Sequence, residues 1–175
     1  MLSLSDNEFS VISFLVRNFS EKLTIRSIAK KLKFSPAGVF NILKKLEEHG
    51  IVKGERLGSG LFYAINFESR IAEHLAAIVL LYSDQKFEKT DVDQLKLAKS
   101  AVLDKENKIV LLITDNVTSL DVKIPGMEVL AKSEDELIAL LRKKDEKMMG
   151  LIRSGVILHG EGNLIEVIKK CVSRF

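Results

Sequence analysis

Cysteine is almost missing from this sequence: Cys171 is the single one in 175 residues. One thiol cannot form an intramolecular disulfide, so a fold held together by disulfides is excluded. The composition is the one expected of a protein that works in the reducing cytoplasm. Because an isolated cysteine usually serves as a small apolar side chain, we expect Cys171 to be buried in the last helix rather than reactive.

Long apolar runs are also missing. No stretch approaches the roughly 18 apolar residues that a membrane-spanning helix needs. The first residues include Asp6 and Glu8, which do not suit a secretory signal peptide. The sequence therefore predicts a protein without a membrane partner, and its 46% hydrophobic content is ample for packed cores.

The sequence lacks the common signatures of enzymes and metal sites. Its three histidines, His49, His74 and His159, are far apart in sequence and show no zinc-ligand spacing. It contains no phosphate-binding P-loop, no dinucleotide-binding fingerprint and no recognisable nucleophile–base pair. We therefore predict no catalytic residue, no cofactor and no metal ligand.

The clearest pattern that is present lies between residues 24 and 50. Apolar residues recur at helical spacing over 25–32 and again over 39–46, which predicts two helices separated by a sharp corner. Ser35 suits the N-cap of the second helix, and Pro36 suits its first position. A short helix, a tight turn and a longer helix make a helix-turn-helix.

Two strand-like runs, 51–56 and 61–66, follow this pair of helices and are separated by a glycine-rich turn. A hairpin there is typical of the wing of a winged helix, and a helix over 5–18 would complete a three-helix core. Any helical hairpin could show the two apolar stripes, so the wing is what favours DNA binding. The run SPAGVFNILKKLEEHGIVKGER, residues 35–56, resembles the recognition helix and wing of MarR-type and TrmB-type winged-helix regulators.

This resemblance implies that the second helix and the wing contact double-stranded DNA. Asn41 can pair with the base edge of adenine, whereas Phe40 either touches a thymine methyl or packs against the wing or a partner chain. The lysines and the arginine suit phosphates, and residues 1–68 carry the whole positive excess, with 10 Lys/Arg against 7 Asp/Glu. The predicted DNA-contacting residues are Ser35, Ala37, Phe40, Asn41, Lys44, Lys45, Lys53 and Arg56.

An unusually apolar helix is predicted after the wing, over residues 70–82. Its last eight residues are all apolar, so we expect the helix to be covered on more than one side. It forms either an interdomain contact or a homodimer interface that includes Ile78, Leu81 or Tyr82. We assign residues 1–68 to the winged-helix domain, 69–91 to this helix with a polar boundary, and 92–175 to a second domain.

The second domain alternates strand and helix patterns. Strands are predicted over five short segments, and helices are predicted from Ser133 to about Arg153 and over 163–173. The overall class is therefore α+β, a winged helix-turn-helix followed by a small α/β domain. The predicted strands are 92–98, 108–114, 121–124, 127–131 and 156–158.

A second resemblance concerns residues 141–168, LRKKDEKMMGLIRSGVILHGEGNLIEVI. This run resembles the C-terminal part of minimal nucleotidyltransferase domains, and the chain as a whole resembles archaeal proteins that join a winged helix to such a domain. The family needs a Gly-Ser after its first strand and an Asp-x-Asp on the next strand to hold two magnesium ions. Lys99-Ser100 stands at the first position.

The Asp-x-Asp position is occupied by Lys108 and Val110, or by Asn107 and Ile109 in the neighbouring register. None of these pairs supplies two carboxylates, so the resemblance implies a catalytically degenerate domain. A nearby acidic pair, Asp104 and Glu106, falls in a turn and is expected to be solvated.

These observations predict a cytoplasmic DNA-binding transcriptional regulator that works as a homodimer. Its second domain would serve dimerisation or the sensing of a small-molecule effector. One alternative is an active nucleotidyltransferase whose winged helix holds its substrate. Another is an interaction module whose winged helix contacts protein instead of DNA.

Overall fold

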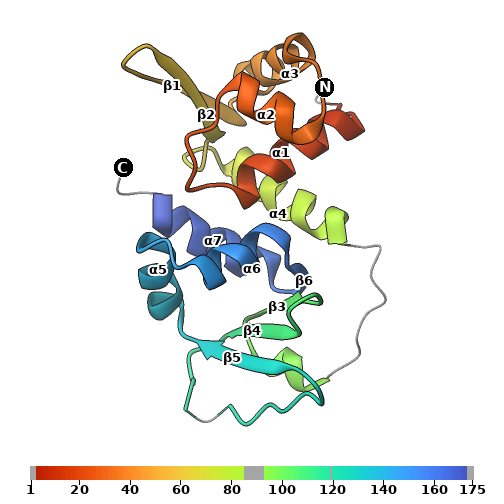
Figure 1. Cartoon of the computed structure of the whole chain (residues 1–175), viewed down its shortest axis with the longest axis vertical. Helices are drawn as coiled ribbons and strands as arrows, with labels where there is room; N and C mark the ends of the chain where they lie inside the picture. The colour runs from red at the N-terminus through yellow and green to blue at the C-terminus, as the bar shows by residue number, and fades with distance from the viewer. Residues whose placement is uncertain (1–2, 85–92, 119, 173–175) are drawn as a thin grey trace. The chain divides into compact units, whose positions relative to one another are not determined.

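The computed structural model describes residues 3–84, 93–118 and 120–172, and the chain divides into two compact units. Unit 1 comprises Met1–Val79 and unit 2 comprises Leu80–Phe175. The division falls within helix α4 (Arg70–Asp84), inside the segment predicted to join the two domains. Each unit combines helices with its own sheet, which confirms the α+β class (Figure 1). No helix formed by the described residues is long and apolar enough to cross a membrane.

Unit 1 begins with three helices followed by a hairpin, as predicted. Local signals set where the helices begin: the Ser5 and Glu8 side chains form a reciprocal cap at the start of the first, and the Ser35 side chain accepts a 3.0 Å hydrogen bond from the Gly38 amide in the third. These elements are α1 (Asp6–Arg17), α2 (Ile25–Leu32), α3 (Pro36–Glu48), β1 (Val52–Leu57) and β2 (Gly60–Ile65).

The wing is an antiparallel pair in which Val52 lies opposite Ile65 at the base and Leu57 lies opposite Gly60 at the tip. Gly58 has a φ of 61°, a left-handed conformation that glycine adopts without a steric penalty, and this allows the tight reversal. Leu23, which precedes α2, adds a single antiparallel bridge to Tyr63 of β2.

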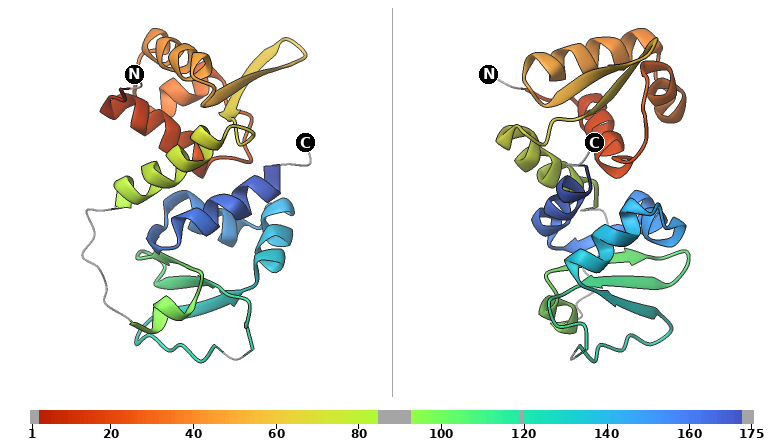
Figure 2. Two further views of the ribbon diagram at one scale, coloured as in Figure 1. Left: turned by 180° about the vertical axis from the view of Figure 1, so that it is seen from behind. Right: turned by 90° about the vertical axis from the view of Figure 1, so that its left-hand side faces the viewer.

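Unit 2 is built around a four-stranded sheet with the order β5-β4-β3-β6, in which only the β4–β5 pair is parallel. Helices α6 and α7 contact β3, and α5 packs on both of these helices (Figures 1 and 2). The elements in chain order are η1 (Asp93–Leu97), β3 (Ser100–Asp104), β4 (Ile109–Ile113), β5 (Glu128–Lys132), α5 (Glu134–Arg142), α6 (Glu146–Ser154), β6 (Val156–His159) and α7 (Glu161–Val172).

Both faces of this sheet are covered. All five residues of β4 are buried, which explains the continuous apolar run that the sequence shows there. On the face away from α6 and α7, a core cluster joins Val110 and Leu112 of β4 to Leu95 of η1 and to Val122 in the β4–β5 connection. That connection therefore covers the sheet even though it contributes no strand in its described part.

Two strand predictions are wrong in this region. Within the segment predicted as the strand 92–98, the structure has the 3₁₀ helix η1, while Val92 lies outside the described residues. Leu95 and Ala98 are buried and Leu97 is 71% exposed, a three-residue spacing that fits 3₁₀ geometry. The segment predicted as the strand 121–124 contains no strand, because it packs on a sheet face and does not pair with an edge.

The sequence analysis also missed strand β3 and joined two helices into one. Strand β3 lacks alternation because both of its faces are buried. The helix predicted over 133–153 is interrupted at Lys144, whose φ of 57° is left-handed. Asp145 then caps α6 by accepting a 3.0 Å hydrogen bond from the Met148 amide. Four consecutive charged residues, 142–145, offer no apolar side chain that would bury a continuous helix there.

Candidate nucleic-acid interface

Helix α3 has one face packed into unit 1 and one face that is free. Val39, Leu43 and Leu46 are fully buried on the packed face. The opposite face carries the predicted DNA-contacting residues of this helix, with spacings of three and four residues that place them in one stripe. These exposed residues are Ala37, Phe40, Asn41 and Lys44, and the exposed Ser35 precedes them at the cap.

Two adjacent lysines of α3 have different surroundings. Lys44 is exposed and forms no ion pair within the described residues. The Lys45 ammonium lies 2.7 Å from Glu8 Oε1 and donates a second hydrogen bond of 2.7 Å to the Ser3 carbonyl. Lys45 thus braces α3 against α1, and its charge already has a partner.

The partner of Lys45 is a buried carboxylate, with only 8% of the Glu8 side chain exposed. Burial by itself raises the pKa of Glu8, but hydrogen bonds from Lys45 and Ser5 outweigh it and hold the pKa below its usual value. Glu8 is therefore ionised at neutral pH and needs the Lys45 ammonium nearby.

The wing contributes two cations with different surroundings. Lys53 lies 3.4 Å from Glu68, and because both side chains are largely exposed this pair is loose. Arg56 is exposed and has no ion-pair partner in the described part of the chain. The wing is tied to the recognition helix through the Gly54 amide, which donates a 3.1 Å hydrogen bond to Glu47 Oε1.

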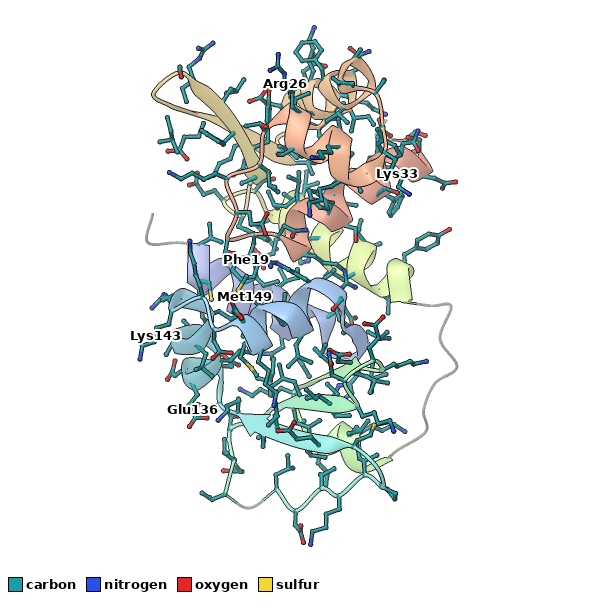
Figure 3. All side chains as sticks on the ribbon, viewed as in Figure 1. Phe19, Arg26, Lys33, Glu136, Lys143 and Met149 are labelled. Atoms are coloured by element: carbon teal, nitrogen blue, oxygen red, sulfur yellow. The ribbon has the colours of Figure 1, made fainter. Side chains whose placement is uncertain are left out.

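Helix α2 adds cations that the sequence analysis did not assign to the interface. The side chains of these cations are exposed and form no ion pair with any described residue. Figure 3 labels two of them, Arg26 and Lys33, which lie at the two ends of α2. The signal that could have revealed them is the stretch 22–46, which has seven Lys/Arg and no Asp/Glu. The four cations are Arg26, Lys30, Lys31 and Lys33.

Unit 2 holds its main polar cluster at the sheet edge where α5 begins. The Glu134 carboxylate accepts hydrogen bonds from Lys170 at 2.8 Å, from Asn163 at 2.8 Å and from Lys99 at 3.2 Å. These donors lower the pKa of Glu134 to about 2, with Lys170 as the largest cause. The buried Ser100 hydroxyl donates to the Gly160 carbonyl at 2.7 Å. The polar groups of this cluster are therefore hydrogen-bonded to one another.

The acidic residues near the predicted Asp-x-Asp position do not form a metal site. Within residues 3–84, 93–118 and 120–172, no three His, Cys, Asp or Glu side chains are close enough to hold a metal ion. Asp104 accepts hydrogen bonds from the Asn107 amide and side chain, which lower its pKa. Glu128 pairs with Lys147 at 2.8 Å.

The Lys99-Ser100 pair does not lie where the resemblance places it: Lys99 directly precedes β3 and Ser100 is the first residue of this strand, and the element before them is the 3₁₀ helix η1. Asp104 is the last residue of β3 and not part of a turn as predicted, whereas Glu106 lies in the turn that follows, and Val110 on β4 is 1% exposed.

Comparison with known proteins gives a family match for unit 1 only. Residues 2–59 match the model of the MarR family. A search of curated proteins found no match. Residues 2–59 of unit 1 are thus similar to MarR-type winged helices.

Among solved structures, the chain is similar to wild-type ZitR of Lactococcus lactis in complex with DNA, with 23% identity and a TM-score of 0.41 over 48% of this chain and 56% of that chain. It is also similar to MepR, a transcription regulator of the Staphylococcus aureus multidrug efflux pump MepA, with 16% identity and a TM-score of 0.40 over 54% of this chain and 73% of that chain. The chain therefore spans little more than half the length of the ZitR structure.

Proposed function

We propose that this chain is a DNA-binding transcriptional regulator whose unit 1 docks on double-stranded DNA. The observation that carries the proposal is the exposed face of α3, flanked by cations that have no ion-pair partner among the described residues. The match of residues 2–59 to the MarR family supports the same conclusion. In this arrangement α3 enters the major groove and the cations of α2 and the wing contact phosphates on either side.

The predicted contacts differ in how freely they can reach DNA. Lys44 and Arg56 are exposed and unpaired within the described chain, so they are the strongest phosphate ligands of the predicted set. Lys53 must give up a loose pair with Glu68. Lys45 must leave the buried Glu8, so we propose that it supports α3 and does not contact DNA.

The test is a titration of the full chain onto a duplex of about 30 base pairs at several salt concentrations. If about 4 to 6 phosphates are contacted, affinity falls by several decades per decade of salt. Neutralising Lys44 and Arg56 should weaken binding to all sequences alike and make the salt dependence shallower. Folded protein that shifts no duplex at low salt would overturn the proposal.

We further propose that the regulator is a homodimer joined through α4. In a single chain, this helix buries a stripe that includes Ala72, Ala76 and Val79 and leaves other large apolar side chains in water. Covering such a stripe with the same stripe of a second copy removes it from water and pairs two winged helices for a two-fold DNA site. The exposed residues are Ile71 at 63%, Ile78 at 54%, Leu81 at 46% and Tyr82 at 59%.

Light scattering tests this assembly. A mass of twice 19.6 kDa at micromolar concentration is expected for the wild type, and Ile78→Asp should shift the population to the monomer. The exposed Leu97 provides a control, since Leu97→Asp removes a similar apolar surface elsewhere and should leave the dimer intact. A wild-type mass of 19.6 kDa would contradict the dimer.

For unit 2 we propose a nucleotidyltransferase-like domain that transfers no nucleotide and instead supports dimerisation or the binding of a small-molecule effector. Two-metal transfer needs carboxylates held a few ångströms apart. Lys108, the last residue of the turn before β4, and the buried Val110 of β4 stand where the resemblance expects two aspartates.

A thermal-shift assay tests this part of the proposal. We expect no magnesium-dependent stabilisation by nucleoside triphosphates and no label transferred from an α-labelled nucleotide to protein or RNA. A magnesium-dependent shift that Asp104→Ala abolishes would contradict it.

A further inference from the structure

We infer that unit 1 selects A·T base pairs, with Asn41 reading adenine and the Phe40 ring contacting a thymine methyl in the same pair or the next one. The inference rests on the proposed DNA-binding function and adds the class of sequence that is bound.

The first support is the exposure of Phe40. Among the described residues from 3 to 69, only two large apolar side chains are exposed: Phe40 at 48% and Leu57 at 40%. Both lie on the elements proposed to contact DNA, α3 and the wing tip. A phenylalanine packed beneath the wing would be covered, so the structure favours the thymine contact over packing on the wing.

The second support is the state of Asn41. Its side chain is exposed and forms no hydrogen bond with other described residues, so its amide nitrogen and oxygen are both available. A side-chain amide with both groups free matches the N6 donor and N7 acceptor that adenine presents in the major groove.

The third support is that α3 lacks a residue suited to reading guanine. Arginine is the commonest specific reader of guanine, and the sequence of α3, PAGVFNILKKLEE, contains none. Its two lysines lie one turn further along, where Lys45 is held by Glu8 and Lys44 suits a phosphate. The reading stripe thus combines an amide for adenine with an apolar ring for thymine.

Helix geometry places the two contacts close together. Consecutive residues rise by about 1.5 Å along a helix, whereas base pairs are stacked about 3.4 Å apart. Phe40 and Asn41 therefore reach the same base pair or adjacent pairs. The small residues Ala37 and Gly38 on the preceding turn leave room for this part of the helix to approach the bases.

The experiment begins with selection of bound duplexes from a randomised pool by the full chain. The expected consensus contains a conserved A·T pair or A·T step in each half-site. Atomic substitutions in the selected site then test each contact, with deoxyuridine removing the thymine methyl and 7-deazaadenine removing the N7 acceptor.

Deoxyuridine should weaken wild-type binding about fourfold per contacted methyl, the value of one buried CH₂ group. Loss of N7 should weaken it by at least about fivefold, near the lower limit for a bidentate contact. Phe40→Ala should become insensitive to deoxyuridine but remain sensitive to 7-deazaadenine. Asn41→Ala should show the opposite pattern. Leu97→Ala, which alters an exposed apolar residue of unit 2, should respond like the wild type.

The outcomes separate this inference from the proposed function. A G·C consensus would overturn it, as would equal loss with deoxyuridine in the wild type and Phe40→Ala. Salt-sensitive binding without any consensus would overturn the inference and leave DNA binding in place. Failure to bind any duplex would overturn the proposed function itself.

Discussion

The cations on α2, α3 and the wing of unit 1 have different surroundings from three lysines of unit 2. On α2, α3 and the wing of unit 1, the following exposed cations have no ion-pair partner among the described residues: Arg26, Lys30, Lys31, Lys33, Lys44 and Arg56. In unit 2, Lys99 and Lys170 both bind the Glu134 carboxylate, and Lys147 binds Glu128. Similar residue types are therefore available on α2, α3 and the wing of unit 1 but are bound by carboxylates around Glu134 and Glu128 of unit 2.

This difference teaches how to recognise a phosphate-binding surface when the net charge is small. The whole chain carries only +3, which predicts little by itself. A cation that already neutralises a carboxylate releases few counterions when it meets a phosphate, so availability matters more than number. The contrast should be tested by removing charges of each kind.

The largest effect is expected from the cations of α2. Replacing Arg26, Lys30 and Lys33 with glutamine should weaken DNA binding several hundredfold at 0.1 M salt, since each lost phosphate contact costs about eightfold relative to 1 M salt. The slope of log affinity against log salt should fall by about 3.

The matched control for this variant lies in unit 2. Replacing Lys99, Lys147 and Lys170 with glutamine should change DNA affinity by less than about twofold, because these cations already have carboxylate partners. Equal losses of affinity in the two triple variants would break the comparison between the units.

The adjacent lysines of α3 give a sharper comparison within unit 1. Lys45→Met should reduce the free energy of unfolding by about 1–3 kcal/mol, because it leaves the buried Glu8 carboxylate without its ion-pair partner. Lys44→Met should change stability by less than about 0.5 kcal/mol but lower DNA affinity about eightfold at 0.1 M salt.

Urea unfolding and DNA titration of both variants check these values. Adding Glu8→Gln to Lys45→Met should restore part of the lost stability, because the uncompensated charge is then gone. A stability loss in Lys44→Met as large as that in Lys45→Met would contradict the assignment of the two lysines.

A smaller effect is expected from the Glu134 cluster of unit 2. The pKa of Glu134 is about 2, below the ordinary value of 4.5. The cluster around this carboxylate therefore stabilises the folded state fully above about pH 5. That stability is lost as pH falls from about 5 toward 2, since protons then bind the unfolded carboxyl more readily. Because Lys99 and Lys170 are half-exposed, solvent screening reduces the contribution to about 1 kcal/mol.

Thermal unfolding as a function of pH checks the Glu134 cluster. Glu134→Gln should be destabilised by about 1 kcal/mol at pH 7, and this difference from the wild type should shrink steadily as pH falls from about 5 toward 2, for as long as the protein stays folded. A difference that does not change with pH would show that the carboxylate charge is not the cause.

The smallest effect concerns Cys171, which is buried. Burial raises the pKa of its thiol to about 11, so little thiolate forms at pH 8. A thiol reagent should therefore label the native protein slowly and the urea-unfolded protein quickly. Rapid labelling in native buffer would contradict the buried position of this residue.

The helices of unit 1 could be predicted from local signals in the sequence. Ser5, Thr24 and Ser35 mark the starts of the helices through contacts within three residues, and each helix buries one periodic stripe. The brace from Lys45 to Glu8 was not predictable, because it joins two helices that are distant in sequence. The cations of α2 were within reach of the sequence, since the acid-free stretch 22–46 contains them.

Unit 2 was harder to predict from the sequence because its strands β3 and β4 are buried on both faces. Strand β3 has no alternation to detect, and the apparent alternation over 92–98 belongs to a 3₁₀ helix. The break between α5 and α6 depends on one left-handed residue, Lys144, in a charged segment that resembled a helix surface. The strand order determines which polar groups lie around Glu134. The spacing of residues in the sequence carries no information about that order.

The pairing of β6 with β3 has a consequence for synthesis of the chain. Strand β6 lies between α6 and α7 in the chain, yet it pairs with β3, the first strand of the sheet. During synthesis on the ribosome, the whole winged helix emerges long before β6. Strand β3 also emerges before β6, so one edge of β3 stays unpaired until β6 follows. A chain that stops before residue 156 would thus carry an intact winged helix beside a sheet whose open edge invites pairing with another chain.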